Sequence, residues 1–172
     1  MMTTSIDSTN RFLIKIGGWS AIASGGLYIL VTVYIFGVLT QFGFTPDMFD
    51  DHTLLHPWVS KHPRFYQITW LFYFLTQLCL LPVPTALANY FKIDGNERTV
   101  ALIQLGRLFS TVAITLAMLS AILFYASSPI TAQAYTRLAE FPESQNLVLT
   151  ISGLITDIAK EIRLFSEILL GI

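Results

Sequence analysis

Charged side chains are scarce in this sequence. Asp, Glu, Lys and Arg make up 12% of its 172 residues, about half the share that is usual in globular domains. So few charges cannot easily cover a water-soluble surface. The formal net charge of −1 also provides no field that would attract nucleic acid. We therefore expect no nucleic-acid partner.

Cysteine and histidine are almost absent as well. Cys79 is the only cysteine, which excludes an intrachain disulfide, a CxxC redox pair and a cysteine-rich zinc site. None of the three histidines lies inside a long apolar run, which argues against a haem-carrying cytochrome. His52 and His56 are four residues apart, but an HExxH context is missing and Pro57 follows directly. We expect solvated loop residues here and no metal site.

Catalytic signatures are missing too. The chain contains no Ser-His-Asp order, phosphate loop, dinucleotide fingerprint or intramembrane protease motif. The sequence therefore favours a non-enzymatic protein without a bound cofactor.

Three long runs contain no charged residue at all. A helix of about 20 apolar residues crosses a hydrocarbon core of ~30 Å, and each run is long enough to do so. Helices are required, because unpaired backbone groups are costly in lipid and the runs lack the alternation of barrel strands. We predict an all-α integral membrane protein with one membrane domain over residues 1–172. The charge-free runs are 16–46, 65–91 and 108–136, and the predicted spans are 14–39, 66–91 and 100–126.

The last segment differs from the three runs, because apolar residues recur there at three- and four-residue steps beside a charged side. We predict a fourth, amphipathic helix over about 144–172. It either lies in the interface or crosses with its charges covered, and the mixed signs of those charges favour a bundle helix. The charged residues are Asp157, Lys160, Glu161, Arg163 and Glu167.

Small residues and prolines give two local predictions. Gly17, Ala21 and Gly25 are spaced by four residues, which predicts a groove where another helix approaches closely. Pro82 and Pro84 remove backbone donors within the second span, which predicts a kink.

Arg107 lies inside the predicted third span, where an unpaired cation is costly. Asp157 and Glu161 place two like charges at i, i+4, which is unfavourable unless a cation relieves them. We predict a bundle ion pair of Arg107 with Asp157 and Glu161. The alternative is that Arg107 extends to the lipid headgroups.

Basic residues are slightly more numerous on the N-terminal side of the predicted membrane. By the positive-inside rule this distribution predicts a multi-pass plasma-membrane protein with a cytoplasmic N-terminus. The first apolar run is too long for a signal peptide, so we expect an uncleaved first span. The basic residues are Arg11, Lys15, Lys92, Arg98 and Arg107 on one side, and Lys61, Arg64 and Arg137 on the other.

Short motifs accompany this pattern: Gly-Gly-Leu-Tyr-Ile at 25–29, Leu-Leu-Pro-Val-Pro-Thr-Ala-Leu-Ala-Asn-Tyr-Phe-Lys at 80–92, and Ala-Leu at 101–102. In these motifs the chain resembles a large family of uncharacterised multi-pass bacterial membrane proteins, known only as a domain of unknown function. The resemblance implies no activity and no catalytic residue. Members usually have further spans, so with the apolar ending Glu-Ile-Leu-Leu-Gly-Ile we expect a longer native chain.

Two functional hypotheses follow. The first is an accessory or scaffold subunit that packs against helices of other membrane subunits or of a second copy. The alternative is a protein that binds or transports a small molecule or lipid, with a cavity between the proline-bent second span and the amphipathic helix. Membrane lipids are expected partners in both.

Overall fold

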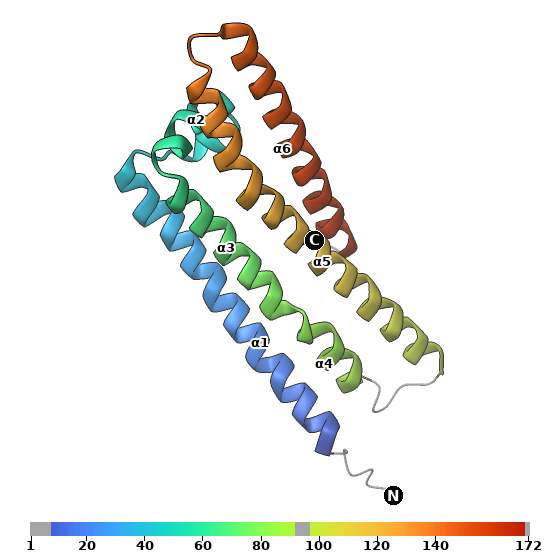
Figure 1. Cartoon of the computed structure of the whole chain (residues 1–172). Coiled ribbons are helices and arrows are strands. Elements are labelled where there is room, and N and C mark those ends of the chain that lie inside the picture. Colours follow the sequence, from blue (N-terminus) through green and yellow to red (C-terminus); the bar gives the residue numbers. More distant parts are fainter. Residues whose placement is uncertain (1–7, 92–96, 171–172) are drawn as a thin grey trace, which may run out of the picture.

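The computed structural model describes residues 8–91 and 97–170, and every long element in it is a helix (Figure 1). The first span is α1 (Ser8–Val33), which continues into a π-helical turn, η1 (Tyr34–Val38), and a 3-10 turn, η2 (Leu39–Phe42). It ends at Gly43, whose φ of 79° is the left-handed conformation that glycine adopts without strain.

Two short helices follow at one end of the bundle (Figure 1). These are η3 (Pro46–Phe49) and α2 (His52–Lys61). Asp51 caps α2, since its side chain accepts a hydrogen bond from the Thr53 amide at 2.9 Å. The expected solvated loop is therefore wrong: α2 packs against α5 and buries its own Leu55, Trp58 and Val59.

The second span consists of α3 (Pro63–Leu80) and α4 (Pro82–Phe91), which are interrupted at Leu81. Pro82 has no amide hydrogen for the Leu78 carbonyl, which instead accepts a bond from the Leu81 amide at 3.3 Å. The interruption lies where the two prolines predict a kink.

The third span is α5 (Glu97–Arg137), whose 41 residues extend past the predicted end at 126. Pro129 lies inside it and frees the carbonyl of Tyr125, four residues earlier. Gln67 of α3 donates to that carbonyl at 3.5 Å. A partner from another helix thus satisfies the group that proline leaves open, as is common in membrane helices.

The last helix is α6 (Pro142–Leu170). Residues 171 and 172, the final two of the predicted helix, lie outside the described residues, and so does Lys92 of the predicted N-terminal basic side. Three segments are long and apolar enough to cross a membrane: Asn10–Phe42, Pro63–Phe91 and Thr99–Arg137. The predicted fold class is confirmed, because the chain is an all-α, multi-pass membrane protein with a further long helix beside its spans.

The helices contact one another in a series. α1 packs against α3 and α4, α3 packs against α5, and α5 packs against α6. α1 and α6 therefore lie at opposite ends of the series, as Figure 1 shows.

Candidate functional site: a groove between α1 and α6

Two adjoining cavities lie where α1 and α6 fail to close the bundle. The first cavity, of about 400 Å³, lies beneath η3 and α2 and reaches α1, α3, α5 and α6. The second, of about 710 Å³, continues between α1, α3 and α6. Tyr28, Tyr73 and Arg163 line both cavities. We call these two adjoining cavities together the α1/α6 groove.

Aromatic rings form much of the wall of the first cavity. Trp70 of α3 stacks on Phe124 of α5, with ring centroids 4.2 Å apart and planes 13° apart. Tyr66 is buried beside them, and Ser128 donates to its hydroxyl at 3.5 Å. Stacked rings held by two different helices make a stable apolar surface.

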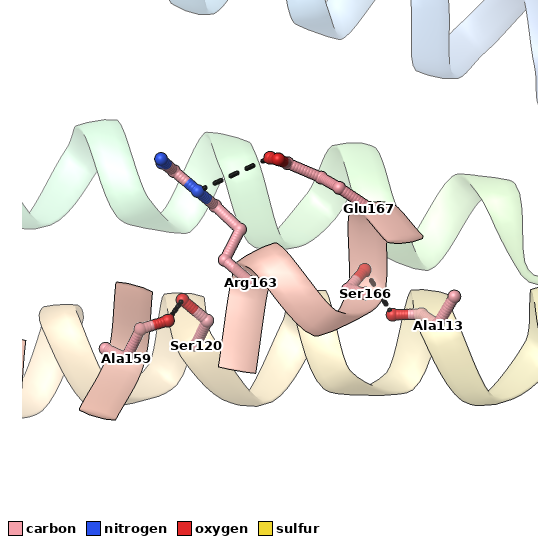
Figure 2. Close-up of polar contacts among 6 residues, drawn as sticks. All are labelled: Ala113, Ser120, Ala159, Arg163, Ser166 and Glu167. Carbon is pink, nitrogen blue, oxygen red and sulfur yellow. Dashed lines mark hydrogen bonds and ion pairs between the residues drawn. The ribbon is translucent and has the colours of Figure 1, made fainter. Parts of the chain in front are cut away.

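Helix α6 contributes charged side chains to this apolar groove. Lys160 Nζ lies 3.1 Å from Asp50 Oδ1, and Arg163 Nε lies 3.5 Å from Glu167 Oε1. Figure 2 shows Arg163 and Glu167 extending from α6 on the side away from α5. The Arg163 Nε is buried and makes no hydrogen bond within the described residues, and its ion-pair partner is the Glu167 carboxylate.

Two serines set the depth of these charges. Ser120 of α5 donates to the carbonyl of Ala159 at 2.9 Å, and Ser166 of α6 donates to the carbonyl of Ala113 at 2.8 Å (Figure 2). These bonds place Lys160 and Arg163 beside the charge-free run of α5. Lys160 reaches the exposed Asp50 outside the spans, whereas Arg163 lies about one turn farther from that end. An ionised group within hydrocarbon is costly and is found facing protein, water or a bound molecule.

The predicted small-residue groove is packed at one position of α1 and open at the other two. Gly17 contacts α4 so closely that a Cβ at this position would overlap the Cβ of Ala86. Ala21 and Gly25 instead line the second cavity, and a Cβ on Gly25 would meet nothing within 4 Å. Close helix packing thus uses only Gly17, whereas the next two small residues leave open space.

The predicted ion pair of Arg107 with Asp157 and Glu161 is wrong. The serine bonds pair residue 113 with 166 and 120 with 159, so Glu161 lies beside residues near 118. That is about 16 Å along the helix from Arg107, and Asp157 is farther still. Arg107 is exposed beside Ala88 and Phe91 of α4, and no ion pair of the described residues includes it.

Small polar residues, and not a buried salt bridge, hold α6 in the bundle. The two serine bonds place Ala159 and Ser166 against α5, and all buried positions of α6 are small, which permits close approach between helices in lipid. These buried positions are Ser152, Thr156, Ala159 and Ser166. Their spacing of three, four and seven residues was the signal in the sequence that could have identified this face.

The expectation of solvated histidines is wrong for His56, whose exposed fraction is only 1%. Its ring lies 5.4 Å from that of Tyr135 and 5.6 Å from that of His52, between centroids. Neither of its ring nitrogens has a hydrogen-bond partner in the described part of the chain. Burial, and then the neighbouring His52, lowers the pKa of His56 from 6.5 to about 4. His52 is half-buried, lines the first cavity, and has a pKa that burial also lowers.

Metal binding has no support in this cluster, since no three His, Cys, Asp or Glu residues among those described could hold an ion. Comparison with known proteins adds no assignment: no family model, curated protein or solved structure matches the chain. The resemblance to the uncharacterised bacterial family stays a prediction.

Proposed function

We propose that this protein lies in the plasma membrane and binds an amphiphilic, lipid-like molecule in its α1/α6 groove, without acting on that molecule chemically. The observation that carries the proposal is the pair of adjoining cavities, apolar along their walls and charged at their border. Their volumes fall within the roughly 300–1,000 Å³ typical of small-molecule sites, which combine apolar walls with a few polar groups.

The position of the charges indicates how the ligand lies. Lys160 and Arg163 sit beside the first cavity, and Arg163 also reaches the second. The guanidinium of Arg163 has five N–H donors, more than its single ion pair with Glu167 uses, and its planar geometry suits further oxygen acceptors on a polar group. A wholly apolar ligand would leave these charges in hydrocarbon, which is costly. An amphiphile satisfies both requirements and can enter from the bilayer between α1 and α6.

The proposed orientation has the N-terminus in the cytoplasm and α2 on the outer side. The N-terminal end of α1 lies at the end of the bundle opposite α2 (Figure 1), and Arg11 and Lys15 belong to its first turns. The positive-inside rule favours the cytoplasm for the more basic side. The first cavity then lies close to the outer surface.

A groove-filling substitution tests the proposal. Gly25→Leu adds a side chain in the second cavity. Gly18→Leu is a matched control on α1, because Gly18 lines neither cavity and a Cβ at either glycine meets nothing within 4 Å. The protein would be extracted into copolymer nanodiscs, and its organic extract analysed by mass spectrometry against bulk membrane lipid. We expect one enriched amphiphile in wild type and Gly18→Leu, and at least a tenfold loss in Gly25→Leu. No enriched species, or equal retention by both variants, would overturn the proposal.

The accessory-subunit function is the second candidate, and the outer charges of α6 favour it. Asp157 and Glu161 are exposed and make no ion pair within the described residues. A cationic residue on a partner helix could neutralise them. In the same nanodisc preparation, this function predicts a stoichiometric protein partner that Asp157→Asn with Glu161→Gln releases. A protein that purifies alone with the groove ligand contradicts it.

A further inference from the structure

The η3–α2 segment forms one end of the first cavity. Phe49, Asp50, His52 and Leu55 of this segment line it. We call residues 46–61, which comprise η3, α2 and the two residues between them, the cap. Three polar contacts tie the cap to the spans and to α6: Asp50 to Lys160 at 3.1 Å, Trp58 Nε1 to the Phe42 carbonyl at 2.8 Å, and Ser60 to Thr136 at 3.1 Å.

The ion pair can contribute little to this closure. The Asp50 side chain is 83% exposed and that of Lys160 is 44% exposed, and exposed pairs contribute at most about 1 kcal/mol. Packing of α2 against α5 therefore holds the cap in place, and His56 lies within that packing.

His56 is compatible with this interface only as a neutral ring. Its exposed fraction is 1%, and neither ring nitrogen has a partner within the described residues. The groups around it are the ring of Tyr135 from α5 and the ring of His52 from its own helix. The charged groups that act on His52 are Lys160 and Asp157 of α6 and Asp50 and Asp51 of the cap. None of these carboxylates acts on His56, so an imidazolium there would be buried without a counter-charge.

We infer that the cap is an acid-released gate: protonation of His56 drives α2 away from α5 and opens the first cavity to the aqueous phase. For its biological purpose this inference rests on the proposed ligand groove, because it would govern access to that site from outside. A His in a two-state element is the usual means by which proteins respond to pH between about 5 and 7.

The direction of the effect follows from linkage. The pKa of His56 is about 4 in the closed state against an ordinary value of 6.5, so the closed state binds fewer protons than the open one. Closure is therefore fully favoured above pH 6.5 and weakens as the pH falls toward 4. Between pH 7.5 and 4.5 the equilibrium shifts toward the open state by up to about 70-fold.

Thiol accessibility measures this opening without any ligand. In a Cys79→Ala background, Thr69→Cys places a reporter at a buried position that lines the first cavity, and Thr156→Cys provides a second reporter from α6. The labelling rate with a charged, membrane-impermeant methanethiosulfonate would be divided by that of Lys61→Cys, an exposed position on α2. This ratio removes the pH dependence of thiol reactivity itself.

We expect the normalised rate to rise by tens of fold from pH 7.5 to 4.5. His56→Leu, which cannot be protonated, should abolish the rise, whereas His62→Leu, directly after the end of α2, should retain it. A flat profile with native His56 at both reporters, or a rise that survives His56→Leu, would overturn the gate. Either result leaves the nanodisc test intact, because that test reports on retention of a ligand and not on cap opening.

Discussion

The contact between Gly17 and Ala86 gives the sharpest test of how the spans pack. A Cβ at Gly17 would overlap the Cβ of Ala86, and neither atom can rotate away because both are fixed to a helix backbone. Replacing Gly17 with Ala must therefore separate α1 from α4. Overpacking of this kind costs about 1–3 kcal/mol, while the change from glycine to alanine in a helix gains up to about 1 kcal/mol in propensity.

Gly18→Ala is the matched control, because its new Cβ meets nothing within 4 Å. The difference between the two variants cancels the propensity gain and leaves the clash. Reversible unfolding in mixed dodecylmaltoside and SDS micelles should show Gly17→Ala less stable than Gly18→Ala by about 1–3 kcal/mol. Adding Ala86→Gly removes the opposing methyl and should recover most of that difference. Equal stability of the two single variants would refute the close approach of α1 and α4.

Two further predictions concern α6 and Arg107. Ser120→Ala and Ser166→Ala each remove a hydrogen bond between α5 and α6, and each should lower the unfolding free energy by about 0.6–1.7 kcal/mol in the same assay. Ser127→Ala is the control, because the Ser127 hydroxyl bonds only to its own helix at Leu123. An equal loss in that control would contradict the role of the two serines. Arg107→Ala should change stability by less than about 0.5 kcal/mol, since the side chain is exposed and has no ion pair in the described structure; a loss of several kcal/mol would instead favour the ion pair that the register of α5 and α6 excludes.

The kinked second span shows how far local sequence information reaches. Pro82 and Pro84 predict a break because proline lacks an amide hydrogen whatever its surroundings, and α3 does end at Leu80. Pro129 carries the same local signal, yet α5 continues through it to Arg137. Gln67 from another helix satisfies the freed carbonyl of Tyr125, and that partner could not be identified from the sequence around Pro129.

The candidate site was predictable only in outline. A cavity beside the second span and the amphipathic helix was one of two alternatives, but its lining and its cap required the structure. His56 illustrates the reason: its neighbours in sequence predict a solvated loop, and its burial comes from Tyr135, which lies 79 residues away. Gly25 is a second example, because its spacing from Gly17 cannot tell a packed position from an open one.

The sequence by itself determined that the chain is helical and crosses a membrane several times. That conclusion depends on sums over about 20 neighbouring residues, and the free energy of placing such a segment in lipid is set by the same local sum. The tertiary structure decided the register of α6 on α5, the loss of the expected Arg107 pair, and the groove left between α1 and α6. These features depend on which small residues of distant segments meet, since helices in lipid associate through close packing and a few hydrogen bonds and not through hydrophobicity. Charge and spacing within one helix do not specify that match.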